Sequence, residues 1–373
     1  MLKSAERMVP ALSKTLRSYK VWVLVPQLET ADPHLEYYYD FSQSFQEYTR
    51  VFDSLEADWI WQPVQINNIE ETIRTVKEKS GAKKPLVINL CDGDEMNGTP
   101  GISVIHALEK EQISYTGSDA CFYEITTSKI PMKEAFDKAG VPTAEWAVID
   151  VHTDDWEKAC EHVPMPLIIK PAISGGSMGV SVKNVVHDNK QLIDRIREIK
   201  QGYRGWQLDA GGIFAEKFIE GPEFTTLVVG DGSSPDTCKV YEPVERVFHP
   251  SLPETEKFLS FDRLWEIYEE ESPMPNNENF YSYISVEEPL CTRLKEISLQ
   301  AYAAVGGKGY GRIDIRMDRN TGELSILEVN AQCGLSEDED YTSIGAILRV
   351  SGVSFTELIG SILKEGMRKN FQF

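Results

Sequence analysis

A charged hairpin between residues 309 and 334, GYGRIDIRMDRNTGELSILEVNAQCG, limits the possible folds of this chain more than any other segment. It predicts two strands, GRIDIRMD and ELSILEVN, joined by a turn whose glycine tolerates a positive φ. Side chains alternate across a strand, so Arg312 and Asp314 share one face of the first strand. By the same rule, Glu328 and Asn330 share one face of the second. The hairpin can therefore gather two carboxylates, an amide oxygen and a guanidinium.

These groups have two interpretations. Carboxylate and amide oxygens suit a hard cation such as Mg²⁺, and an adjacent arginine suits a phosphate or another oxyanion. The alternative is an exposed hairpin whose charges pair with one another, because surface ion pairs are common and contribute little. A nucleotide site elsewhere in the chain would favour the magnesium interpretation.

The composition excludes several classes of partner. The 373 residues suffice for two or three domains with substantial cores. No apolar run approaches the roughly 20 residues that cross a bilayer. A net charge of −21 argues against nucleic acid and against anionic membranes, so neither partner is expected. Six scattered cysteines without a CxxC pair argue against zinc and favour reduced thiols in a cytoplasmic protein.

Residues 1–20 are either an organelle-targeting segment or, as we favour, a short leading helix.

Strand-like and helix-like segments alternate from Val21 to about residue 122, which predicts a βαβ domain with a mostly parallel sheet. The segments are VWVLV, SFQEYTRVFDSLE, WIWQPV, NNIEETIRTVKEKSG, PLVINL and a helix from Gly101 to Lys110. The strand PLVINL runs into the polar loop Cys91–Asp94. An α/β sheet commonly places its ligands in such a loop. An ordinary acidic loop is the alternative.

A lysine and a glycine-rich loop follow an apolar strand in IIKPAISGGSMGVSVKNV, where Lys170 precedes Gly175, Gly176 and Ser177. Glycines let the backbone approach a phosphate, and successive N–H groups can cradle it. Lys170 would add a point charge. The order differs from a P-loop, because the lysine precedes the glycines and VSVKNV is predicted to be a strand rather than a helix. A plain flexible hairpin is the alternative.

Lys129 and two glutamates are weaker candidates for nucleotide contacts. Lys129 lies at the start of a predicted helix that Thr127 or Ser128 would cap, where it could meet an anion. A solvated helix lysine is the commoner case. Glu216 and Glu223 lie near the ends of apolar strands, where they could accept hydrogen bonds from the amino and ribose groups of a nucleotide. Glutamates that face solvent are the alternative.

The remaining segments frame the hairpin. Residues 248–288 are loop-rich and predict a lid or a disordered insert. Helices are predicted from Pro289 to Val305 and from Thr342 to Arg368, on either side of the hairpin.

Taken in order, these segments resemble an ATP-grasp ligase and, within that superfamily, the D-alanine–D-alanine ligases. The resemblance covers about residues 85–365 and is carried by ISYTGSDA with TTSKIPMK, IIKPAISGGSMGV, EKFIEGPEFT, KGYGRIDIRMD and ILEVNAQCGLS. It implies an α/β protein of the ATP-grasp fold, with three α/β domains and ATP between the central and C-terminal ones. The expected domains are residues 1–122, 123–212 and 213–373, with the lid insert near 248–288.

The resemblance also implies which residues bind ATP, magnesium and the reacting groups. The expected ATP contacts are Lys129, Lys170, Gly175, Gly176, Ser177, Glu216, Lys217, Ile219 and Glu223. The lysines and the loop would meet the phosphates, Glu216 with the backbone at 217 and 219 would meet adenine, and Glu223 would meet the ribose. The expected ligands of two Mg²⁺ ions, for which Mn²⁺ could substitute, are Asp314, Glu328 and Asn330. Arg312 and the Gly334 N–H would stabilise the charged intermediate.

The implied reaction joins a small-molecule carboxylate to a small-molecule amine. ATP phosphorylates the carboxylate, the amine attacks the acyl phosphate, and phosphate leaves while mobile loops exclude water. The family further implies a homodimer and a cytoplasmic location. Two other functions are a non-catalytic ATP-binding or regulatory protein on this fold, and phosphoryl transfer to a small-molecule alcohol. The complete charged hairpin argues against the first, because ATP binding alone needs fewer groups.

The sequence departs from the family in both loops that contact the first substrate. The family's glycine-rich first loop with its glutamate is replaced by PQLETADPHLEYYYD, in which Glu29 or Glu36 could substitute. Its histidine–glycine loop is replaced by LCDGDEMNG. D-alanine is therefore not a secure prediction for the first substrate.

Two further departures concern the lid and the amine site. The lid lacks the family's lysine and tyrosine, which leaves Arg246 or Arg263 as possible phosphate partners. Thr342 and Ser343 would hold the carboxylate of the amine substrate. The acids at positions 337–340 are predicted to crowd that site and to favour a cationic or uncharged amine.

Overall fold

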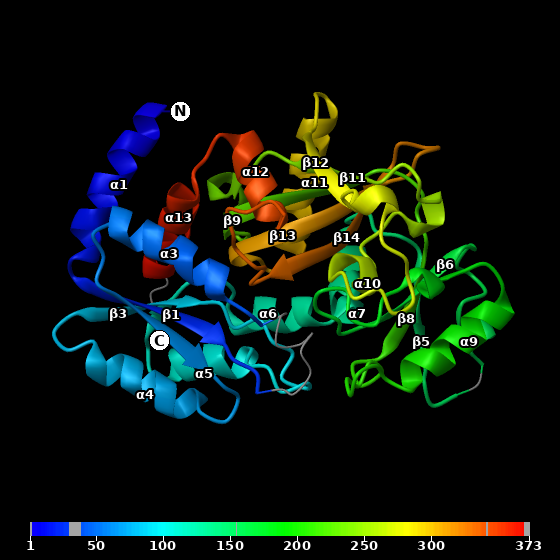
Figure 1. Cartoon of the computed structure of the whole chain (residues 1–373), viewed down its shortest axis with the longest axis horizontal. Coiled ribbons are helices and arrows are strands. Elements are labelled where there is room, and N and C mark those ends of the chain that lie inside the picture. Colours follow the sequence, from blue (N-terminus) through cyan, green and yellow to red (C-terminus); the bar gives the residue numbers. More distant parts are fainter. Residues whose placement is uncertain (1, 30–38, 154, 341, 369–373) are drawn as a thin grey trace.

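The computed structural model describes residues 2–29, 39–153, 155–340 and 342–368, and three β-sheets organise them (Figure 1). The first sheet is parallel, and the other two are antiparallel. In the view of Figure 1 the first sheet lies at lower left, the second at right, and the third across the centre. The mixed α/β architecture expected from the sequence is confirmed.

The first sheet has the strand order β2-β1-β3-β4. Its strands are β1 (Tyr19–Pro26), β2 (Trp59–Val64), β3 (Lys84–Asn89) and β4 (Ser114–Tyr115). The helices of this part of the chain are α1 (Leu2–Leu16), α3 (Ser42–Ser54), α4 (Ile69–Lys79) and α5 (Ile102–Lys110). The predicted βαβ alternation and the predicted leading helix are therefore both present.

The second sheet has the order β5-β8-β6-β7. Its strands are β5 (Trp146–Ile149), β6 (Leu167–Pro171), β7 (Val185–Val186) and β8 (Ile213–Lys217). The helices of this region are α6 (Ala120–Thr127), α7 (Lys129–Ala139), α8 (Trp156–Ala159) and α9 (Asn189–Lys200). Because β8 pairs with β5 and β6, this sheet continues past residue 212, where the sequence analysis divides the chain.

The predicted strand VSVKNV is wrong. Residues Val182–Asn184 form a 3₁₀ helix, and only Val185–Val186 pair with β6. The Ser181 N–H donates to Asn184 Oδ1 at 2.7 Å, and the Asn184 amide donates to the Gly179 carbonyl at 3.1 Å. Serine and asparagine side chains compete with a strand ladder in this way, which the alternating apolar pattern did not reveal.

The third sheet has the order β12-β11-β9-β13-β14, with β10 added to β9. Its strands are β9 (Glu223–Asp231), β10 (Lys239–Val240), β11 (Val244–Phe248), β12 (Tyr281–Ser285), β13 (Lys308–Met317) and β14 (Leu324–Ala331). Its helices are α10 (Phe261–Leu264), α11 (Leu290–Ala304), α12 (Ser343–Ser351) and α13 (Phe355–Arg368). Short 3₁₀ helices cover Pro235–Thr237, Glu254–Glu256 and Pro275–Asn277.

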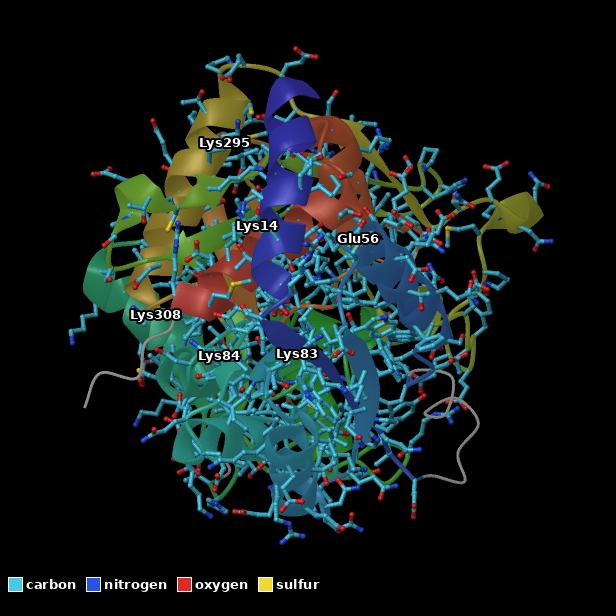
Figure 2. The ribbon with its side chains drawn as sticks, turned by 90° about the vertical axis from the view of Figure 1, so that its left-hand side faces the viewer. Lys14, Glu56, Lys83, Lys84, Lys295 and Lys308 are labelled. Carbon is cyan, nitrogen blue, oxygen red and sulfur yellow. The ribbon has the colours of Figure 1, made fainter. Side chains whose placement is uncertain are left out.

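The predicted C-terminal helix is two helices rather than one. Gly352 ends α12 with a φ of +62°, a left-handed conformation that glycine adopts without strain. The break redirects α13, whose Ile359 and Leu363 pack in one buried cluster with Val23 of β1 and Leu227 of β9. Helix α1 lies across this region (Figure 2), and a Cβ at Gly360 would come within 2.9 Å of Leu12 Cδ2. The C-terminal helix therefore joins the first sheet to the third.

The two faces of the third sheet differ in character. Ile313 and Val329 lie in a buried cluster with Phe122 of α6 and Phe136 of α7, so these helices cover one face. Arg312 and Asp314 alternate with Ile313 and belong to the other face. Within the described ranges no single helix is long and apolar enough to span a membrane, although α12 and α13, bent by 101°, pass by length and composition together.

The segment 248–288 is an ordered insert. The Asp262 carboxylate accepts the backbone N–H groups of Glu270 and Glu271, at 2.6 and 3.0 Å. Glu271 in turn accepts the Val182 N–H at 2.9 Å and pairs with Arg263 at 3.3 Å. These buried polar contacts attach the insert to the glycine-loop region of the second sheet.

Candidate active site

A cavity of about 440 Å³ opens between the polar face of the third sheet, the second sheet and the loops that follow the first. It contains every residue that the family resemblance assigns to ATP, to magnesium or to the reacting groups. These are Lys129, Lys170, Gly175, Gly176, Ser177, Glu216, Lys217, Ile219, Glu223, Arg312, Asp314, Glu328, Asn330 and Gly334. Their individual roles remain predictions, but segments up to 205 residues apart in sequence share one cavity.

The hairpin places its charges as the alternation predicts. Asp314 lies opposite Glu328, and Arg312 lies opposite Asn330, with a bulge directly after Asp314. The Arg312 guanidinium donates to Asp314 Oδ2 at 2.8 Å, and the Asn330 amide donates to Asp314 and to Glu328 at 3.1 Å each. Two carboxylates and one amide therefore converge, a donor set that suits Mg²⁺.

Lys129 joins this group from the first turn of α7. Its Nζ lies 3.4 Å from Glu328 Oε2 and donates to the Ser174 carbonyl at 3.1 Å. Burial favours the protonated form of Glu328, but Lys129 and Arg312 outweigh burial and lower its pKa to about 2. The carboxylate is therefore ionised at neutral pH, as a metal ligand must be.

Glu216 lines the cavity and is paired with two lysines. Its carboxylate lies 2.7 Å from Lys170 Nζ and 2.5 Å from Lys133 Nζ, and the Lys133 and Glu216 side chains are 1% and 2% exposed. Burial opposes ionisation of Glu216, but the two ammonium groups lower its pKa to about 2. The arrangement indicates that Glu216 orients Lys170. The sequence analysis did not name Lys133. Its position one helical turn after Lys129 puts both lysines on one face of the helix and could have indicated it.

Glu223 is enclosed by two arginines in one row across four strands. Tyr283, Arg246, Glu223 and Arg316 lie opposite one another in the register of β12, β11, β9 and β13. Arg246 contacts the Glu223 carboxylate, and Arg316 donates to it at 2.8 Å. The predicted ribose contact would therefore share Glu223 with two guanidinium groups. The sequence analysis did not name Arg316, because the alternation of side chains does not show which residue of a neighbouring strand lies beside it.

The lid contacts the glycine loop and decides between the two candidate arginines. The Trp265 indole donates to the Gly176 carbonyl at 2.8 Å, and Ser177 adopts a φ of +64° in that loop. Arg246 lines the cavity. Arg263 does not line it and pairs with Glu256 at 2.7 Å. Of the two arginines considered in place of the family's lid lysine, only Arg246 is therefore positioned to meet a ligand.

Gln332 positions the turn that carries the Gly334 N–H. Its buried amide accepts the Ser118 N–H and donates to the Asn89 carbonyl, both at 2.9 Å. The backbone of Gln332 has a φ of +56°, and a Cβ on Gly117 would lie 1.5 Å from Gln332 Oε1. One side chain therefore ties the end of β3, the loop after β4 and the Gly334 turn together.

Replacing Gln332 by alanine is expected to destabilise the protein and to disturb this turn. The change would leave the Ser118 N–H and the Asn89 carbonyl buried without partners, at a cost of about 1–3 kcal/mol each. We expect a lower midpoint in urea unfolding and reduced turnover in the surviving folded protein. Ser325→Ala, on the same hairpin but without a side-chain hydrogen bond among the described contacts, is the control. Equal stability of the two variants would contradict the bridging role.

The predicted crowding of the amine site by acids is wrong. Glu337 pairs with Arg50 at 2.5 Å, Glu339 pairs with Arg349 at 2.7 Å, and none of the acids at 337–340 lines the cavity. The arginines come from α3 and α12, which the sequence did not place beside this loop. Thr342 and Ser343 do line the cavity, and their buried hydroxyls have no hydrogen-bond partner among the described residues.

The loops of the first sheet bring Asp92 and Asp94, and not Glu29, to the cavity. Glu29 accepts a hydrogen bond from the Gln65 amide at 2.9 Å and does not line the cavity, and Glu36 lies outside the described residues. Asp92 and Asp94, in the loop after β3, do line the cavity. The ligand-loop interpretation of Cys91–Asp94 therefore gains support over an ordinary acidic loop.

Two solved structures that share this architecture are ligases. The chain is similar to D-alanine–D-alanine ligase from Bacillus anthracis complexed with ATP, with TM-score 0.64 and 17% identity over 94% of this chain and 97% of that one. It is similar to the VanG D-Ala:D-Ser ligase from Enterococcus faecalis, with TM-score 0.67 and 18% identity over 94% and 98%. The fold is that of the ATP-grasp ligases.

Sequence comparisons narrow this class. The family model for the D-ala D-ala ligase C-terminus matches residues 135–364. D-alanine–D-alanine ligase from Xanthomonas axonopodis pv. citri is 26% identical over 75% of this chain and 77% of its own length. D-alanine–D-alanine ligase B from Xanthomonas campestris pv. campestris is 27% identical over the same shares. The chain belongs to the D-alanine–D-alanine ligase family, whose activity is ATP-dependent ligation.

Proposed function

We propose that this protein is an ADP-forming carboxylate–amine ligase that makes an amide bond through an acyl phosphate. The observation that carries the proposal is the convergence of Lys129, Lys170, Arg312, the Asp314–Glu328 pair and Gly334 on one cavity. Binding alone would not need the guanidinium and the carboxylates on the same sheet face. The substrates are a small-molecule carboxylate and a small-molecule amine, both amino-acid-like.

Each group has a defined part in this proposal. Lys129 and Lys170 hold the phosphates beneath the loop of Gly175, Gly176 and Ser177. Mg²⁺ held by the Asp314, Glu328 and Asn330 side chains would neutralise the transferred phosphate. Arg312 and the Gly334 N–H face the carboxylate oxygens, where negative charge develops in both steps.

The amine substrate is placed by the other wall of the cavity. Thr342 and Ser343 lie at the N-terminus of α12, where backbone N–H groups and the helix dipole favour an anion. Their hydroxyls, which have no partner among the described residues, would bind the carboxylate of an amino-acid amine. A homodimer in the cytoplasm is expected from the family, and light scattering of the purified protein would test the dimer.

The decisive test is phosphate release with ATP and Mg²⁺ across a matrix of amino acids and amines, with product masses recorded. We expect release to require both a carboxylate and an amine, and to be lost in Asp314→Ala. A stable phosphorylated alcohol would instead establish phosphoryl transfer. Tight ATP binding without any product would favour the non-catalytic alternative.

A further inference from the structure

Asp92 is an ionisable side chain in the cavity that the reaction proposed above does not use. More than a third of its surface is exposed, and it lines the cavity. Burial among protein atoms raises its pKa to about 6, and the neighbouring Asp94 adds to the increase. It is therefore largely ionised at neutral pH, although its surroundings make the charge costly.

The loop that carries Asp92 is held rigidly. The Tyr123 hydroxyl donates to the Gly93 carbonyl at 2.7 Å, and the Gly93 N–H donates to the Pro100 carbonyl at 2.9 Å. A Cβ on Gly93 would lie 2.2 Å from the Thr99 carbonyl oxygen, so the loop is closely packed. The fold therefore fixes the backbone position of the loop that carries Asp92.

Among the acids of the cavity, Asp92 is the one to which the described residues give neither a side-chain hydrogen bond nor a salt bridge. Asp94 accepts hydrogen bonds from the Asn97 N–H at 3.0 Å and the Asn97 amide at 2.8 Å. In the rest of the cavity Glu216, Glu223, Asp314 and Glu328 are each paired with a lysine or an arginine. Within the described ranges no side chain donates a hydrogen bond to the Asp92 carboxylate, and no basic residue forms a salt bridge with it.

Asp92 also lies close to the reacting end of the cavity. Burial is the main reason why the pKa of the Cys333 thiol is raised. The charges of Asp314 and Asp92 raise this pKa further, whereas Arg312 lowers it. Cys333 directly precedes Gly334, and Gln332 ties this turn to Asn89 at the start of the Asp92 loop. A ligand with its carboxylate at Arg312 and Gly334 would therefore extend a neighbouring group toward Asp92.

The same cavity offers a second, independent sign of a polar ligand. Ser343 is 3% exposed and lines the cavity, and its hydroxyl has no hydrogen-bond partner among the described residues. A buried hydroxyl without a partner costs free energy unless a ligand or water satisfies it. The cavity therefore contains two polar side chains, Asp92 and Ser343, that a polar ligand could satisfy.

We infer that Asp92 binds a cationic amino group on the carboxylate substrate and selects amino acids over acids that lack this group. The inference rests on the proposed function and assigns its specificity to the loop after β3. Of the two first-loop glutamates considered for this role, Glu29 is bound to Gln65 outside the cavity, and Glu36 lies outside the described residues. An ammonium group would offset the charge of Asp92, which the described residues leave unpaired.

The test uses hydroxylamine as a common amine, so that only the carboxylate site is varied. An acyl phosphate and hydroxylamine give a hydroxamate and phosphate, and the hydroxamate is measured with ATP and Mg²⁺ present. Glycine, alanine and serine are compared with glycolate, lactate and glycerate, in both configurations where these exist. Binding of the same acids is measured by calorimetry with a non-hydrolysable ATP analogue and Mg²⁺.

We expect the wild-type protein to prefer the amino acid of a pair, and Asp92→Asn to reduce that preference about 10- to 100-fold, since hydrogen bonds to charged groups contribute about 1.5–3 kcal/mol. Glu29→Gln should leave the preference unchanged. The preference should also fall below pH 6 in the wild-type protein but not in Asp92→Asn. This pH dependence separates recognition from a merely structural role.

Three results would overturn the inference. They are an unchanged preference in Asp92→Asn, a wild-type preference for hydroxy acids, and failure of the wild-type protein to bind any of the amino acids. Failure of the proposed function has a different signature, namely binding of an amino acid with intact selectivity but no hydroxamate. The two proposals are therefore tested separately in one set of measurements.

Discussion

Replacing Glu216 by alanine is expected to lower the free energy of unfolding by about 3–5 kcal/mol, the usual effect of breaking a buried ion pair. The change would leave Lys133, which is 1% exposed, without its carboxylate partner at 2.5 Å. Lys170, which is 17% exposed at the cavity wall, would also lose the group that orients it. Urea unfolding followed by circular dichroism measures the loss.

The pH dependence of this effect has a defined sign. Lys133 and Lys170 hold the pKa of the buried Glu216 at about 2, below its ordinary value of 4.5. A carboxyl group whose pKa is lowered by folding stabilises the protein above its unfolded pKa, and this contribution is lost as the pH falls through the folded pKa. The difference between wild type and Glu216→Gln should therefore be largest above pH 4.5 and shrink toward pH 2.

Two variants control for this interpretation. Glu220→Ala removes an exposed glutamate a few residues away and should change the stability by less than about 0.5 kcal/mol. Lys133→Met in the Glu216→Ala background should recover part of the loss, because it removes the uncompensated buried charge. A double variant no more stable than Glu216→Ala would show that the cost does not come from stranding Lys133.

Replacing Arg312 by alanine is expected to reduce kcat about 10²- to 10³-fold, the effect of removing one preorganised donor from a developing oxyanion. Arg312 faces the cavity from β13 and is held in place by Asp314 at 2.8 Å. Its loss should affect the chemical steps more than the binding of ATP. Phosphate release at saturating substrate, together with nucleotide binding by calorimetry, separates the two effects.

Arg319→Ala is the matched control for this prediction. Arg319 lies at the turn of the same hairpin, and its side chain is 52% exposed and paired with Glu254. It should retain wild-type turnover. Turnover in Arg312→Ala within a few fold of wild type would remove Arg312 from the proposed mechanism.

The hairpin shows how much of the site follows from sequence alone. A period of two along a strand is a local property, so Arg312, Asp314, Glu328 and Asn330 could be assigned to one face before any tertiary contact was known. The glycine at 322, with a φ of +71°, likewise follows from turn chemistry. The same local reasoning failed at residues 180–185, where Ser181 and Asn184 bind the backbone instead of letting it extend.

What the sequence by itself determined is most of the helices and strands and the residues with the right chemistry, because periodicity, turns and charge type are local. Only the tertiary structure decided which charges meet. Glu216 lies between Lys133 and Lys170, a pairing that the sequence did not show. Glu337 and Glu339 were expected in the amine site but pair with Arg50 and Arg349 outside the cavity. Asp92 belongs to a loop whose two interpretations the sequence left open, and among the described residues no cation pairs with it in the cavity. Electrostatic energy depends on distance in space and on burial, and neither quantity is encoded in the spacing of residues along a chain.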